Sequence, residues 1–166
     1  MKIKQQNINK SLLILLSLSF FVRAVLAMII EFGNDEVYYW TYAMYPDWSH
    51  FDHPPMVGWL IQLFSCNLLF DSEFFLRLSS VVFMTINTYL VFLIGKQVKN
   101  EQTGFYAALL YTASIYAFVI TGIFILPDTP LSIFTLLAVL QFVKYFQYDK
   151  NKHLLLAGLF TGLAML

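Results

Sequence analysis

Long apolar runs separated by short polar segments dominate the pattern of this chain. A transmembrane helix needs about 20 mostly apolar residues. Four runs come close to this length, and a fifth continues to the last residue; they are 11–30, 74–95, 104–126, 131–146 and 153–166. Arg23, Arg77 and Lys144 are the only charged residues inside them. The pattern predicts an all-α polytopic membrane protein, a bundle of helical spans with a long loop at residues 31–73.

The segment 56–70 decides the topology, because it is apolar but only 15 residues long. Such a length suits an interfacial helix better than a span. If it does not cross, all eight lysines fall on one side of the membrane, which the positive-inside rule identifies as cytoplasmic. We therefore expect a cytoplasmic N-terminus, an outer loop at 31–73 that carries interfacial helices, and location in a plasma membrane.

Composition narrows the possible classes of protein further. The chain has 166 residues, of which 59% are hydrophobic and 12% charged, with a formal net charge of zero. Disordered chains and nucleic-acid binders are excluded, since the first are charge-rich and the second carry a basic excess. The single cysteine excludes an internal disulfide and a Cys-rich zinc site.

Two features of the ends lead to expectations about processing and completeness. The first run exceeds the 7–15 residues typical of a signal-peptide core, which favours an uncleaved span. The last run reaches the final residue with no loop or tail after it. We expect an N-terminal part of a larger membrane protein; the alternative is a short protein with a re-entrant tail.

Eight of the ten acids share the outer side with no lysine, and this needs its own explanation. In the outer loop, Gly33 and Asn34 predict a helix start with Asn34 as N-cap. Asp35, Tyr38, Tyr39 and Tyr42 then share one helical face, and Pro46 ends the helix. The carboxylates of Asp35 and Glu36 fit either helix capping or acid–base chemistry.

Two further acids stand beside prolines. Asp52 and His53 precede Pro54 and Pro55, which stiffen the chain and present a carboxylate beside an imidazole. Such a pair can bind a divalent ion or a phosphate, or form a solvated turn. Asp128, on the same side after the third span, is either an N-cap or a functional acid near bilayer depth.

These residues resemble a family. The ordered set resembles the integral-membrane GT-C glycosyltransferases, and more closely the bacterial members of the dolichyl-phosphate-mannose protein mannosyltransferase superfamily, which include the lipid A aminoarabinose transferases. The segments that carry the resemblance are 34–40 (NDEVYYW), 45–47 (YPD), 51–59 (FDHPPMVGW), 74–78 (FFLRL) and 126–131 (LPDTPL). The resemblance extends over about residues 10–166.

The resemblance implies inverting transfer of a sugar from a polyprenyl-phosphate donor to a lipid, glycan or protein acceptor on the outer face. Asp35 corresponds to the catalytic acid–base residue and Glu36 to its neighbour. His53 corresponds to the basic residue that faces the lipid phosphate. Arg77 is a second candidate for binding this phosphate, and it also suits an interfacial anchor. The resemblance allows a divalent metal ion at Asp52 and Asp128, and stacking of the sugar on Tyr38, Tyr39 and Trp59; these aromatics also suit an interfacial belt.

Two other functions fit a chain of this kind. A transporter component would use the acids as ion ligands, and a non-catalytic membrane protein would keep only the fold. No internal repeat, which transporters often show, is found in the sequence. The Asp35–Glu36 pair that a degenerate relative would lose is intact.

Overall fold

The computed structural model describes residues 5–166, with side chains from Asn7 onward, and Lys2 and Lys4 lie outside this part. The described chain is entirely helical. Its elements are α1 (Gln5–Ile29), α2 (Asn34–Met44), α3 (Met56–Phe64), α4 (Glu73–Val98), α5 (Glu101–Ala113), the π-helical turn η1 (Tyr116–Ile120), α6 (Thr121–Ile123), α7 (Asp128–Tyr148) and α8 (Asn151–Ala164). The predicted all-α polytopic fold is confirmed.

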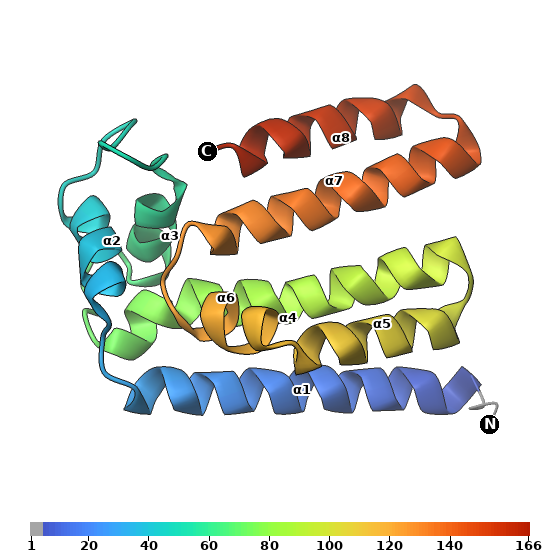
Figure 1. The fold of residues 1–166 in the computed structure, drawn as a ribbon, viewed down its shortest axis with the longest axis horizontal. Coiled ribbons are helices and arrows are strands. Elements are labelled where there is room, and N and C mark those ends of the chain that lie inside the picture. Colours follow the sequence, from blue (N-terminus) through green and yellow to red (C-terminus); the bar gives the residue numbers. More distant parts are fainter. Residues whose placement is uncertain (1–4) are drawn as a thin grey trace.

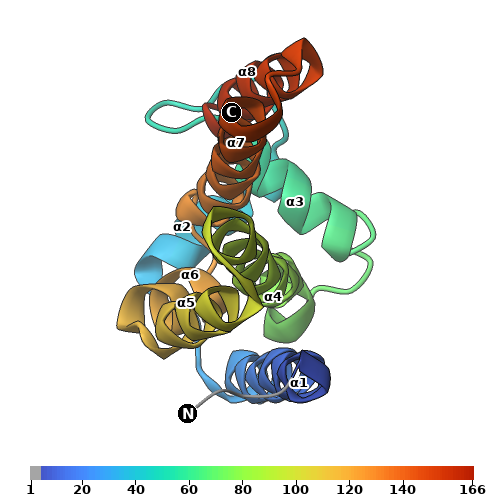
Figure 2. The same cartoon turned by 90° about the vertical axis from the view of Figure 1, so that its right-hand side faces the viewer.

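The long helices lie side by side in a stack (Figures 1 and 2). Helix α4 is central, since it packs against α1, α5 and α7, and α8 covers α7 on the far side. Three helices, Asn7–Ile29, Glu73–Val98 and Asp128–Tyr148, are long and apolar enough to cross a membrane. The chain is therefore a multi-pass membrane protein. Helix α8 begins the expected fifth span, which stays a prediction.

The third predicted span takes a bent form. Residues 101–123 form two helical pieces that meet at 73°, so they are a broken span or a re-entrant loop. The break lies at Ser114, whose backbone is extended. The Ser114 hydroxyl accepts a hydrogen bond of 3.2 Å from the Ala117 N–H, which caps the second piece in the manner of a helix N-cap.

Helices α2 and α3 lie together at the end of the stack where α1 ends and α4 begins (Figure 1). Nine residues of α3 span about 14 Å, roughly half of the hydrocarbon core, so this helix does not cross. Gly58 permits its close approach to α2, because a Cβ at this position would lie 2.9 Å from the Tyr42 carbonyl oxygen. We call this the site end, made of residues 30–72 and 124–130.

The opposite end of the stack carries the α4–α5 and α7–α8 connections (Figure 1). Lys96, Lys99, Lys150 and Lys152 lie in or beside these connections, away from the acids of the site end. The fold therefore separates these lysines from most of the acids along the stack, while Glu101, which pairs with Lys96, and Asp149 lie at the lysine-rich end. The assignment of the lysine-rich end to the cytoplasm stays a prediction.

Candidate functional site

Glu36 and Arg77 form a buried ion pair at the base of the site end. Arg77 Nε donates to Glu36 Oε1 at 2.7 Å, and its Nη2 donates to Oε2 at 2.6 Å. The same carboxylate accepts from the backbone N–H of Ile125 and of Gly33, each at 3.1 Å. The start of α2 is thus tied to α4 and to the α6–α7 connection. With four donors and 2% exposure, Glu36 is a positioning group.

Arg77 also closes the end of α1. Its remaining N–H groups donate to the carbonyl oxygens of Ala27, Ile30 and Glu31, which lie in the last turn of α1 or just after it. Such carbonyls lack partners within their own helix. Since all five donors are used and the side chain is 0% exposed, the structure surrounds Arg77 with protein groups. The expected contact with a lipid phosphate finds no support in this placement.

Asp35 has the opposite surroundings. It lies in the first turn of α2, is exposed, and has no hydrogen bond or ion pair among the described residues. Its carboxylate borders a cavity of about 460 Å³. The cavity is lined by the start of α2 and by residues around α6, namely Gly33, Asn34, Asp35, Glu36, Ile120, Phe124 and Leu126. A free carboxylate beside an open cavity is available to a substrate. Helix α2 begins at Asn34, with Gly33 in the cap position expected for Asn34.

Asp52 is held by two tyrosines of α2. Its Oδ1 accepts hydrogen bonds from the hydroxyls of Tyr38 at 2.7 Å and Tyr42 at 2.6 Å. These bonds hold the pKa of Asp52 below its usual value, while burial and the bond to Asp52 raise the pKa of Tyr42. The His50 ring stacks on Tyr42 with centroids 3.6 Å apart. The loop before α3 is therefore fastened to α2.

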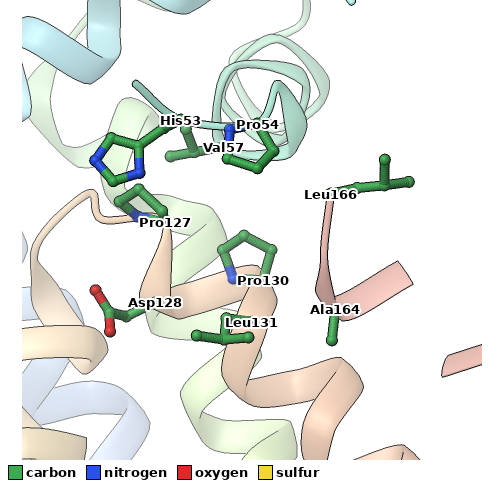
Figure 3. Close-up of a pocket in the computed structure, with 9 residues that line it drawn as sticks. All are labelled: His53, Pro54, Val57, Pro127, Asp128, Pro130, Leu131, Ala164 and Leu166. Carbon is green, nitrogen blue, oxygen red and sulfur yellow. The ribbon is translucent and has the colours of Figure 1, made fainter. Parts of the chain in front are cut away.

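His53 and Asp128 line a second cavity of about 260 Å³ (Figure 3). Figure 3 shows them on either side of Pro127, with Ala164 and Leu166 on the far wall. His53 Nε2 lies 3.9 Å from Asp52 Oδ2, and Asp128 Oδ1 accepts from the Tyr116 hydroxyl at 2.5 Å. The structure thus joins an imidazole from the outer loop with a carboxylate from the start of α7.

Tyr39 connects the parts of the site. Its ring lies edge-on to His53, with centroids 5.5 Å apart. Burial raises the pKa of the Tyr39 hydroxyl, and the negative charges of Asp52, Asp35 and Asp128 raise it further. The charges of these three acids therefore act on one phenol, although Asp35 and Asp128 line different cavities. The predicted roles of the acids stay predictions.

The predicted stacking residues occupy three different settings. Tyr38 bonds to Asp52, and Tyr39 is largely buried in the core between α2 and α3. Trp59 packs edge-on against Trp48 at 5.3 Å. It borders a separate shallow cavity of about 420 Å³ with Pro46 and Asp47. Of the three, Trp59 borders a cavity that Asp35, Asp52 and Asp128 do not line.

The described residues contain no group of three or more His, Cys, Asp or Glu side chains that could hold a metal ion. Asp52 uses Oδ1 for two tyrosines, and Asp128 uses Oδ1 for Tyr116. This donor set does not fit a metal centre. A metal at Asp52 and Asp128 stays a prediction from the resemblance, and no step below uses one.

Sequence reasoning did not assign three residues of the site. Tyr42 lies on the predicted face of α2, one turn after Tyr38, so its pairing with a loop acid follows the helical spacing. His50 lies in the same loop as His53, and its stacking on Tyr42 has no sequence signal. Tyr116 reaches Asp128 only because the chain bends at Ser114.

Comparison with known proteins identifies the family of the chain. The profile of the family described as dolichyl-phosphate-mannose-protein mannosyltransferase matches residues 52–166, which include Asp52, His53, Arg77 and Asp128 but not Asp35 or Glu36. Searches of curated proteins and of solved structures found no significant match. Members of the matched family are glycosyltransferases that use dolichyl- or polyprenyl-phosphate sugar donors. Since the match covers well over half of the chain, this protein belongs to the dolichyl-phosphate-mannose-protein mannosyltransferase family.

Proposed function

We propose that the site end transfers a sugar from a polyprenyl-phosphate donor to an acceptor hydroxyl, with inversion at the anomeric carbon and Asp35 as the base. One observation carries this proposal. Among the four acids of the site, Glu36 is bound by Arg77, Asp52 by two tyrosines and Asp128 by Tyr116, whereas Asp35 has no partner in the described structure. A base must be free to accept a proton at the reacting atoms.

The proposed reaction is a single displacement. The acceptor oxygen forms a bond to the anomeric carbon and gives its proton to the Asp35 carboxylate. The bond from this carbon to the phosphate oxygen breaks, and the electron pair leaves with the polyprenyl phosphate. The sugar is therefore attached with inverted configuration, and no redox partner is needed.

The other residues support this displacement from fixed positions. His53, at the mouth of the second cavity, opposes the charge of the departing phosphate when its imidazole is protonated. Glu36 and Arg77 hold the start of α2, and so the backbone of Asp35, against α4. A displaced Asp35 would lose the alignment on which a general base depends.

The proposed location of the reaction follows from the positions of Asp35 and His53. Donor lipid and acceptor meet at the site end, which we assign to the outer face of a bacterial inner membrane. The acceptor is a glycolipid, a glycan or a protein. Among the functions that fit a chain of this type, family membership favours the transferase over a transporter component.

The test uses membranes that contain the chain and polyprenyl-phosphate mannose with a labelled sugar. We expect transfer of label into the glycan, lipid or protein fraction, and a loss of about 100-fold or more with Asp35→Asn. Asp71→Asn, which changes an exposed acid of the same loop, serves as the matched control and should transfer normally. Undiminished transfer by Asp35→Asn would remove Asp35 from its role. No transfer by the unaltered chain would favour a non-catalytic protein of the same fold.

A further inference from the structure

Arg23 is a completely buried cation with no hydrogen-bond acceptor and no carboxylate partner among the described residues. It lies in α1, within a helix long enough to cross a membrane, six residues before the last residue of that helix or about 9 Å along its axis. Its side chain is 0% exposed, and none of its three nitrogens has an acceptor among the described residues. An ionisable group at such a depth is costly and is kept where it serves a function.

The surroundings are shaped to hold a guanidinium. The Phe118 ring lies over the guanidinium carbon at 4.9 Å, which is a cation–π distance. On Gly122, an added Cβ would lie 2.9 Å from Arg23 Nε and 3.3 Å from Cδ. A side chain other than glycine would therefore take part of the space that the arginine fills. This fit marks a built position for the charge.

The described residues supply space for Arg23 but no anion. The described ion pairs join Glu36, Asp52, Glu73 and Glu101 to other cations, and none reaches Arg23. Its neighbours on the same helix, Ala24 and Ala27, belong to an apolar cluster with Val81 and Ile123. Buried polar groups in folded proteins nearly always have a partner, so this one calls for a partner that the described residues do not provide.

Phe118, which covers Arg23, lies next to the break in the bent helix. Phe118 is only half-buried and belongs to η1, a π-helical turn that begins just after the break at Ser114. Such turns occur frequently at functional sites. The residues at the bend, Ser114, Ile115 and Tyr116, are exposed. Rotation of the Phe118 ring away from α1 would open the guanidinium to a group beside the bent helix.

We propose that Arg23 binds the phosphate oxyanion of a membrane lipid, which replaces the Phe118 ring over the guanidinium. A planar guanidinium binds two phosphate oxygens at once, which suits this anion better than a single point charge. Membrane lipids carry the anions nearest to this depth, since Arg23 lies about 9 Å along the axis from the end of α1. The proposal rests on the proposed function in one respect, since polyprenyl phosphate is one such lipid; an anionic phospholipid is the other.

The test measures binding to the chain in nanodiscs of neutral phosphatidylcholine, with polyprenyl phosphate, phosphatidylglycerol and inorganic phosphate as separate probes. We expect binding of one lipid phosphate, weakened at least tenfold by Arg23→Met and less by Arg23→Lys. Lys10→Met, which removes an exposed cation from the same helix, should leave binding unchanged. Which lipid binds distinguishes the donor from a phospholipid, and binding of inorganic phosphate with neither lipid would overturn the proposal.

Two further readouts separate this role from a structural one. Arg23→Met should remain folded and be at least as resistant to unfolding as the unaltered chain, because it removes a charge without a protein partner. Phe118→Leu should bind the lipid several-fold more tightly, because the ring no longer competes. A misfolded Arg23→Met or weaker binding by Phe118→Leu would contradict the proposal. If Arg23→Met and the unaltered chain bound polyprenyl phosphate equally, the role of Arg23 would be overturned and the proposed function would stand. If the unaltered chain did not bind that lipid, the result would count against the proposed function.

Discussion

Arg77 of α4 and Arg23 of α1 lie on neighbouring helices and are both fully buried, but only Arg77 has hydrogen-bond acceptors among the described residues. Every N–H of Arg77 has an acceptor, and a carboxylate faces it. None of the nitrogens of Arg23 has an acceptor in the described structure. Burial alone therefore does not tell what an arginine in a membrane helix does. The partners distinguish the two roles. Arg77 connects the elements of the site end, whereas Arg23 has space for a ligand.

Burial of either arginine costs free energy of desolvation. A buried charge loses its hydration, and only partners in good geometry offset that loss. For Arg77 the partners are within the chain, so removing them leaves a charge exposed to an apolar interior. For Arg23 the loss is not offset within the described residues. The two positions should consequently respond in opposite ways to loss of the guanidinium.

The largest expected effect comes from breaking the Arg77 pair. Arg77→Met leaves the Glu36 carboxylate buried without its cation, and we expect a loss of about 3–5 kcal/mol in the free energy of unfolding. Denaturant unfolding of the chain in detergent micelles measures it. Combining the change with Glu36→Leu should restore part of the stability, since no unpaired charge then remains.

Glu73 provides the matched control for this prediction. Its carboxylate lies 3.7 Å from Arg77 Nη1, but its side chain is 42% exposed. Exposed pairs contribute about 0–1 kcal/mol, so Glu73→Gln should change stability little. Equal losses from Arg77→Met and Glu73→Gln would show that the contacts to Glu36 do not matter more than a surface pair.

A smaller effect is expected where the chain makes room for Arg23. In Gly122→Ala, the new Cβ would lie 2.5 Å from the Ala117 carbonyl oxygen and 2.9 Å from Arg23 Nε. We expect a loss of about 1–3 kcal/mol from overpacking. In an Arg23→Ala background the loss should be smaller, because one of the two clashes is gone.

Gly158 offers the comparison for that change. It is a helical glycine of α8 with nothing within 4 Å of an added Cβ. Gly158→Ala should raise stability by about 0.5–1 kcal/mol, through helix propensity alone. If Gly122→Ala also raised the stability, the close packing of Gly122 against Arg23 would be contradicted.

The helical fold could be predicted largely from the spacing of apolar runs, and one feature could not. Spans at 11–30, 74–95 and 131–146 match long helices because unbroken apolar runs of this length have few alternatives in a bilayer. The bend at Ser114 has no proline or glycine to announce it. It depends on a serine hydroxyl that caps the next helical piece, an interaction that many serines make without a bend.

The sequence singled out the acids Asp35, Glu36, Asp52 and Asp128 but not the groups that bind them. Adjacent helix residues point about 100° apart, so only one of Asp35 and Glu36 can reach α4, although both border the cavity. The sequence holds no sign of which one does, since the partner, Arg77, is 41 positions from Glu36. The tertiary arrangement makes this choice, and it turns an apparent pair of acids into one structural group and one free carboxylate.

The smallest expected effect concerns Asp52, a partnered group at the surface. The hydroxyls of Tyr38 and Tyr42 hold its pKa below the ordinary 3.8. Ionised Asp52 therefore stabilises the fold fully above pH 3.8, and this stabilisation is lost as the pH falls through the lowered pKa. Tyr38→Phe together with Tyr42→Phe should bring the pKa of Asp52 back toward 3.8, measured by carbon NMR of the labelled carboxyl group.

Tyr45→Phe removes a more exposed hydroxyl from the C-cap of the same helix and should leave the pKa of Asp52 unchanged. A pKa that stays low in the double variant would assign it to the nearby His53 instead, which lies 3.9 Å away. The outcome extends the comparison of the two arginines to an acid. Where a charged group has partners within the chain, its titration follows those partners, and where it has none, as at Asp35, the group is left free to act on a substrate.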